Sequence, residues 1–208
     1  REKSSDVGSA ASELFSLLIA PPVSKRRDEW MVRLARGLEE LKRKQEEFDI
    51  SSLTNNEVFV TTVLQATQAA LRNHQEEKLE ALKNAVINCA MGIDIEENVQ
   101  IMFLELIDTF TPWHLRILKF FQDPKSWFLV NGKAEPNFYT GALSHVLEEA
   151  FNELRGKRPF YDLIVKDLYA HGLLGVDSLH AMMTGSGLLT KRSTEFGDLF
   201  LSYITSPV

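Results

Sequence analysis

Apolar side chains recur at helical spacing through the first 110 residues, which carry almost no alternation of the β type. Such alternation is what a half-buried strand requires. The clearest stretch places four apolar side chains along one side of a helix: Trp30, Leu34, Leu38 and Leu41. The pattern predicts an antiparallel helical bundle over residues 10–110, preceded by a disordered polar tail at residues 1–9.

Prolines and capping residues divide this predicted bundle into separate helices. A short apolar helix at residues 10–20 is expected to stop at the double proline Pro21-Pro22. Ser24 can cap the next helix, which we expect to continue to about Phe48.

Further along the chain, the letters TNNE at residues 54–57 have the spacing of a capping box, in which Thr54 and Glu57 satisfy each other's backbone amides. A helix is expected from there to Arg72, followed by helices at residues 75–91 and 94–109. The expected buried side of the first of these is Val60, Val63, Leu64 and Leu71.

The second half begins at Thr111-Pro112, where Thr is expected as the N-cap and Pro at the first helical position. Residues 123–139 predict a long irregular segment, and residues 140–155 predict a helix closed by Gly156. A further helix is expected between Pro159 and Gly172.

Residues 177–193 are split by Gly-Ser-Gly at 185–187 and predict a two-stranded ribbon. Residues 194–203 predict the last helix. This order resembles a winged helix-turn-helix over roughly residues 111–205, through the letters DLYAHGLL at 167–174 and STEFGDLFLSYI at 193–204. The expected fold is therefore mainly α: a helical bundle followed by a winged-helix-like unit with a small β-ribbon.

The letters FTPWHLRIL at residues 110–118, together with DLYAHGLL, also resemble the bacterial abortive-infection alpha (Abi-alpha) proteins. That resemblance implies a bacterial cytoplasmic protein linked to the phage response, for which the family has no agreed activity. The function expected from it is a non-enzymatic interaction or regulatory protein with a protein partner or a second copy of itself.

DNA binding by the winged-helix-like unit is the alternative function. Its phosphate and base contacts would come from six basic residues: Arg155, Lys157, Arg158, Lys166, Lys191 and Arg192. Three acidic residues close to them in sequence would repel phosphate: Glu153, Asp162 and Asp167. A contiguous positive face over the basic residues would favour DNA, whereas an apolar or mixed face would favour protein.

The distribution of charge gives no support to a broadly basic surface. Residues 1–111 hold 13 Lys and Arg against 19 Asp and Glu, and residues 112–208 hold 10 against 10. A protein that binds nucleic acid nonspecifically needs a basic surface to neutralise phosphates. Only a local patch could serve that purpose here.

No catalytic, cofactor-binding or metal-ligating constellation stands out in the sequence. His145 has Glu148 and Glu149 at helical spacing, but no second ligand pair accompanies them. The single cysteine, Cys89, lies in an apolar run and is expected to be buried and unreactive. We therefore expect no enzyme.

The longest apolar run, residues 14–23, is about half the length needed to span a bilayer. With the basic residues 25–27 it could lie on an anionic membrane surface, although packing on the bundle is the more common role of such a segment. Trp30 and Met31 could form part of a homodimer face.

Overall fold

The computed structural model describes residues 12–45 and 48–207. Over these residues the chain is mainly helical with a small two-stranded antiparallel sheet, which confirms the coarse expectation of a mainly α protein that carries a small β element. The predicted tail at residues 1–9 lies outside the described residues. Two compact units divide the chain: the first extends to Asp108 and includes the chain from Tyr203 onward, and the second is Thr109–Ser202.

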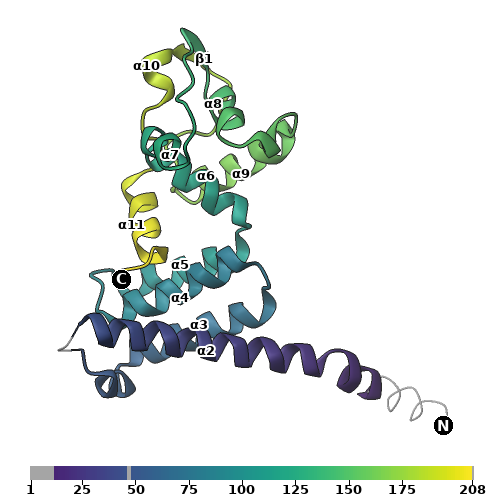
Figure 1. Cartoon of the computed structure of the whole chain (residues 1–208), viewed down its shortest axis with the longest axis vertical. Coiled ribbons are helices and arrows are strands. Elements are labelled where there is room, and N and C mark those ends of the chain that lie inside the picture. The colour runs from purple at the N-terminus through teal and green to yellow at the C-terminus, as the bar shows by residue number, and fades with distance from the viewer. Residues whose placement is uncertain (1–11, 46–47, 208) are drawn as a thin grey trace. The chain divides into compact units, whose positions relative to one another are not determined.

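From Ala20 onward the described part of the first unit contains α2, η1, α3, α4 and α5, and Figure 1 shows α2 lying along α3 and α4. Their bounds are α2 Ala20–Lys44, η1 Ile50–Asn55, α3 Glu57–Arg72, α4 Glu76–Ala90 and α5 Glu97–Thr109. The side of α2 that faces the bundle is the apolar side predicted from the sequence. Its buried residues are Trp30, Leu34, Gly37 and Leu41. Cys89 is buried as expected, and burial raises the pKa of its thiol.

Several of the predicted helix boundaries and caps in this unit are wrong. Residues 12–18 are helical and α2 then begins at Ala20, so Pro21 and Pro22 occupy the first turn of α2, where their missing amides cost no hydrogen bond. Ser24 therefore lies inside α2 and caps nothing, and α2 ends at Lys44, before Phe48. The capping box at residues 54–57 is also absent, because Asn56 is the N-cap of α3 and accepts from Phe59 N at 3.0 Å.

The side of α3 that packs on its neighbours also differs from the prediction. Val60 and Leu64 are 39% and 59% exposed, and the buried residues are Thr62, Ala66, Ala69 and Ala70. Small side chains let helices approach closely, so in α3 the alanine row rather than the bulky row forms the contact. Trp30 fills part of this contact and donates from Nε1 to Thr67 Oγ1 at 2.9 Å.

The end of the chain is bound to α4 by two buried asparagines. The side-chain amide of Asn88 donates to Tyr203 O at 2.8 Å and Thr205 O at 2.9 Å, and that of Asn84 donates to Ile204 O at 3.0 Å. The last carbonyl groups of a helix have no partner within the helix, so these amides satisfy acceptors that burial would otherwise leave unpaired.

Asn88→Ala is therefore expected to lower the free energy of unfolding of the first unit by about 2–4 kcal/mol, because two carbonyl groups lose their donor. Urea unfolding followed by circular dichroism measures this change. Asn98→Ala is the matched control, since Asn98 is exposed and donates only to the nearby carboxylate of Glu96. Equal midpoints for the two variants would contradict the role of Asn88.

The second unit contains the sheet and six helices, together with a short 3-10 helix. Their bounds are α6 Pro112–Gln122, α7 Pro124–Val130, β1 Thr140–Ala142, α8 Leu143–Ala150, η2 Asn152–Leu154, α9 Arg158–Ala170, β2 Met182–Thr184, α10 Gly185–Leu188 and α11 Glu195–Ile204, whose last two residues belong to the first unit. Its core is rich in aromatic residues, with Phe120 in contact with Phe121, Trp127, Phe128 and Phe151.

The sequence placed the strands of this unit incorrectly. Residues 177–193 do not form a ribbon of their own, because β2 pairs with β1 instead, in the register Thr140 to Thr184 and Ala142 to Met182. Gly185 begins α10, and a Cβ atom there would lie 2.0 Å from Phe138 O, so this glycine permits a close approach of two backbones.

Two further expectations fail in the segment before β1 and at its end. Residues 123–139 are not irregular throughout, because Asp123 caps α7 by accepting from Ser126 N at 3.0 Å. Residues 140–142 are a strand rather than the start of a helix. The helix expected to run to Gly156 ends earlier, because α8 stops at Ala150 and Gly156, with a φ of 74°, follows η2 instead. The predicted end of α9 at Gly172 is confirmed, with a φ of 72°.

Candidate interaction surface

The candidate surface is the outward side of α9, the helix that a winged helix-turn-helix would use to read DNA. Pro159 lies in its first turn, where its missing amide needs no partner. The opposite side of α9 is buried in the core through Tyr161, Ile164, Val165 and Leu168. The direction in which the remaining side chains point is therefore fixed by the packing of this helix.

Two of the six predicted basic residues form ion pairs at this surface. Arg155 Nη2 lies 2.8 Å from Glu149 Oε1, and Arg158 Nε lies 3.4 Å from Asp162 Oδ2. Both arginine side chains remain more than half exposed, so the pairs contribute little to stability. They do place a carboxylate beside each guanidinium, which reduces the positive potential available to a phosphate.

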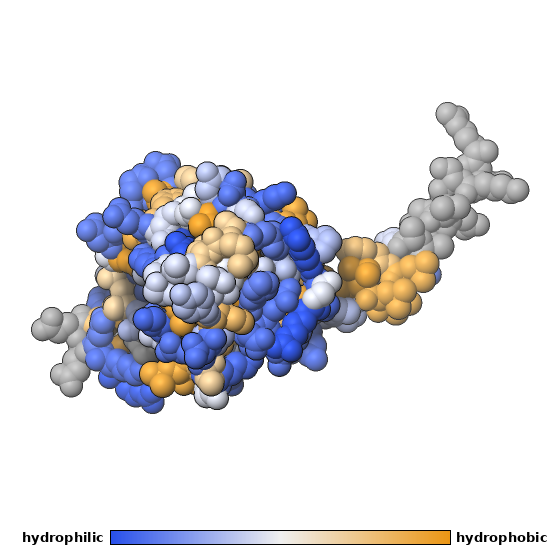
Figure 2. Space-filling model, turned by 90° about the horizontal axis from the view of Figure 1, so that it is seen from above, coloured by the Kyte–Doolittle hydropathy of each residue, from blue (hydrophilic) through white to orange (hydrophobic). Residues whose placement is uncertain are grey.

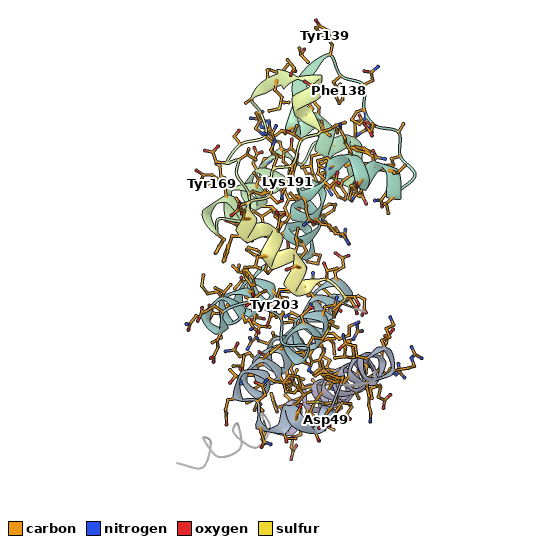
Figure 3. All side chains as sticks on the ribbon, turned by 90° about the vertical axis from the view of Figure 1, so that its left-hand side faces the viewer. Asp49, Phe138, Tyr139, Tyr169, Lys191 and Tyr203 are labelled. Carbon is orange, nitrogen blue, oxygen red and sulfur yellow. The ribbon has the colours of Figure 1, made fainter. Side chains whose placement is uncertain are left out.

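The two basic residues before α11 are also bound within the unit. Lys191 (labelled in Figure 3) forms an ion pair with Asp198 through its Nζ atom, and Arg192 donates from Nη2 to Gly187 O at 2.7 Å. Partial burial works to raise the pKa of Asp198, but hydrogen bonds led by that from Lys191 hold it below its ordinary value. Asp198 is therefore ionised at neutral pH and neutralises Lys191.

The exposed residues of α9 also include three large apolar side chains. Phe160, Leu163 and Tyr169 are 40%, 59% and 49% exposed (Tyr169 is labelled in Figure 3). Lys157 and Lys166, the remaining two predicted residues, are exposed near them. The six residues are thus not one contiguous positive face; the surface is mixed, with apolar side chains between paired charges.

The acidic residues of this region have separate partners. Asp162 Oδ1 lies 2.7 Å from His180 Nε2, and Tyr161 donates its hydroxyl to Glu148 Oε1 at 2.9 Å. Burial, with help from Glu148, raises the pKa of Tyr161 to about 12. His145 is turned instead toward the backbone amide of Ala142, at 3.4 Å.

Among the described residues, no group of three or more His, Cys, Asp or Glu side chains is placed to hold a metal ion. The His145, Glu148 and Glu149 set singled out by its spacing does not converge, because Glu148 accepts from Tyr161 and Glu149 pairs with Arg155.

A second surface, between α6 and α7, was missed by the sequence reasoning. It is a groove of about 400 Å³ with a mixed lining of charged, polar, aromatic and aliphatic side chains: Arg116, Lys119, Gln122, Asp123, Ser126, Trp127, Val130, Asn131 and Phe151. The guanidinium of Arg116 lies 4.9 Å from the ring centroid of Trp113. The pair Arg116 and Lys119 was visible in the sequence as the polar side of an amphipathic helix, but nothing there indicated an aromatic wall.

A buried histidine connects α6 to α9. His114 Nδ1 accepts from Thr111 N at 3.1 Å, so the proton of the neutral ring lies on Nε2, which faces Asp167 Oδ2 at 3.4 Å. Its ring stacks on Phe110 with centroids 4.5 Å apart. Burial lowers the pKa of His114 below its ordinary value of 6.5, although Asp167 opposes this shift.

This lowered pKa predicts a loss of stability in mild acid. His114 binds a proton more readily in the unfolded chain than in the folded chain. The contribution of the neutral ring to the free energy of unfolding is therefore fully present above about pH 6.5. It is lost as the pH falls toward the lower pKa of His114 in the folded chain. Urea unfolding of the second unit at pH 7.5 and pH 5.5 measures the effect. The His114→Gln variant should show less of this pH dependence, and an unchanged dependence would contradict the assignment.

Among the helices that the structure describes, none combines the length and the apolar character that crossing a bilayer demands. Comparison of the chain with models of protein families, with curated proteins and with solved structures finds no match. The function is therefore argued from the surface itself.

Proposed function

We propose that this chain is a non-enzymatic regulatory protein that binds a protein partner through the outward side of α9. The observation that carries the proposal is the exposure of Phe160, Leu163 and Tyr169 on a helix whose other side is fully packed. Aromatic residues of this kind are enriched at protein interfaces, where a few large side chains supply most of the binding energy.

The charges at this surface suit a protein partner better than DNA. Arg155, Arg158 and Lys191 each have a carboxylate neighbour, so a phosphate would have to compete with it. At a protein interface the same pairs would form a polar rim around the apolar side chains. The likeness to Abi-alpha proteins extends this proposal to a bacterial cytoplasmic protein of the phage response, and the single buried cysteine is compatible with a reducing compartment.

DNA binding is kept as the second candidate because the order of elements favours it. Helices α8 and α9 are followed by β2, which pairs with β1 from before α8, and a winged helix-turn-helix has this arrangement. Lys157 and Lys166 would then be the phosphate contacts, together with Arg155, Arg158, Lys191 and Arg192 once their intramolecular partners are displaced.

The proposal is tested by photo-crosslinking in cells. A benzophenone amino acid replaces Lys166, and the crosslinked species is identified in an otherwise unchanged chain and in two variants. Leu163→Asp should reduce a specific protein adduct by more than about tenfold, as expected for a central interface residue. Leu129→Asp is the matched control, because Leu129 is 79% exposed and lies on α7, outside the α9 surface.

A protein adduct that survives Leu163→Asp would contradict the proposal. Adducts with nucleic acid in place of protein would favour the second candidate instead.

A further inference from the structure

Residues 14–23, named here the apolar arm, form an apolar surface that no part of the described chain covers. The side chains concerned are 40–73% exposed: Leu14, Phe15, Leu17, Leu18, Ile19 and Val23. Figure 2 shows them as an orange patch at the right of the view. The expectation that this segment packs on the bundle is wrong, because α2 makes its first buried contact only at Trp30.

The arm is held away from the bundle as a continuous helical extension. Ile19 N donates to Phe15 O at 2.9 Å, and Val23 N donates to Ile19 O at 3.2 Å, so hydrogen bonding bridges the step at the two prolines. From Trp30 onward the same helix is anchored by buried side chains. A helix that is apolar around most of its circumference is ordinarily buried. We therefore expect a binding partner to cover the apolar surface of the arm.

The charges at the two ends of the arm indicate which kind of partner binds it. Glu13 precedes the arm, and Lys25, Arg26 and Arg27 follow it. An anionic membrane would gain little attraction, because Arg27 pairs with Asp28 and the whole chain carries a net charge of −6. The contact of Lys25 with Glu29 is exposed and 3.7 Å long, so Lys25 can still pair with another carboxylate. An acidic start and a basic end complement each other when two copies of the arm lie antiparallel.

We infer that this partner is a second copy of this chain, bound arm to arm about a two-fold axis near Ile19. In this arrangement Glu13 of each copy lies opposite Lys25 of the other, and Phe15 lies opposite Val23. The small side chain of Ala20 lies opposite Leu18 and leaves room for it. A two-fold contact of this kind uses the same surface on both copies and makes every favourable pair twice.

The dimer concerns a different surface from α9 and stands independently of the proposed function. Of the expected homodimer face, Trp30 cannot take part because it is only 2% exposed, whereas Met31 is 45% exposed and stays a candidate.

Sedimentation equilibrium over a range of protein concentrations tests the inference. The chain should reach twice its 23.6 kDa mass, and Leu18→Glu should leave it monomeric over the same range. Leu129→Glu is the control and should dimerise like the unchanged chain, because it adds the same charge at an exposed apolar site on α7. Leu18 is itself 64% exposed, so its replacement should leave the circular dichroism spectrum unchanged.

A charge exchange tests the antiparallel register. Glu13→Lys should raise the dissociation constant by about three- to tenfold, because it sets like charges opposite each other twice per dimer. The double variant Glu13→Lys with Lys25→Glu should return it to within about twofold of the original value by the same reasoning.

A chain that is monomeric at every concentration would overturn the inference, as would a dimer that Leu18→Glu leaves intact. Flotation with vesicles containing phosphatidylglycerol distinguishes membrane binding by the arm from dimerisation. Vesicle binding by a monomeric chain, lost in Leu18→Glu, would assign the arm to lipid and overturn the second copy.

Discussion

Phe120→Ala is expected to lower the free energy of unfolding of the second unit by about 3–5 kcal/mol. Phe120 is fully buried, and its ring meets those of Phe121, Trp127, Phe128 and Phe151 at centroid separations of 5.0–5.9 Å. Truncation removes all four edge contacts and leaves a cavity that rigid aromatic neighbours cannot fill.

Urea unfolding followed by tryptophan fluorescence measures this loss, because Trp127 reports directly on the cluster. Leu129→Ala is the control: Leu129 is 79% exposed, so its replacement should change stability by no more than about 0.5 kcal/mol. A Phe120→Ala variant as stable as this control would contradict the central place of the aromatic cluster in the core.

The second large effect is expected for Gly197→Ala, at the start of α11. A Cβ atom at Gly197 would lie 2.2 Å from Leu173 O and 3.1 Å from Leu173 C, both of them backbone atoms. Neither can turn aside as a side chain would, so α11 would have to shift away from the segment after α9. We expect a loss of about 3 kcal/mol, at the upper end of ordinary overpacking.

Gly187→Ala is the matched control for this substitution. The nearest atom to a Cβ atom there is Met183 Sδ at 3.6 Å, which is an ordinary contact. Both variants are compared by thermal unfolding, and a melting temperature for Gly197→Ala equal to that of Gly187→Ala would show that the close approach to Leu173 is not a constraint.

The successes and failures of sequence reasoning have identifiable physical causes. The buried side of α2 was predicted correctly because Trp30, Leu34 and Leu41 face a bundle that buries large side chains. The same reasoning failed for α3, because alanine scores weakly as apolar although Ala66 and Ala69 make the close helix contact. Helical spacing identifies a helix more securely than it identifies the buried side.

The strand pairing could not be read from local pattern. Residues 182–184 pair with residues 140–142, some 40 positions away, and neither strand is long enough to show alternation. The glycines at 185 and 187 indicated a break in the chain, which is correct, but the partner of the strand before that break is set by the tertiary fold.

The candidate surface was partly predictable. The sequence located a basic cluster around α9 and also noted the acidic residues near it. The pairing of acidic with basic residues depends on the tertiary fold. Arg155, in the turn after α8, pairs with Glu149, and Asp198 of α11 pairs with Lys191. The exposure of Leu163 follows from the packing of the opposite side of α9, which composition does not reveal.

The most direct test of the central claim is fluorescence anisotropy of a random-sequence DNA duplex, titrated with the protein from low to physiological salt. If the ion pairs of Arg155, Arg158 and Lys191 with carboxylates of the chain withhold these three residues from phosphate, binding at physiological salt should be weaker than about 10⁻⁴ M, the weak limit of ordinary nonspecific binding. Tight binding that falls steeply with salt, and that Arg158→Ala and Lys191→Ala each weaken, would contradict the claim and assign this surface to DNA.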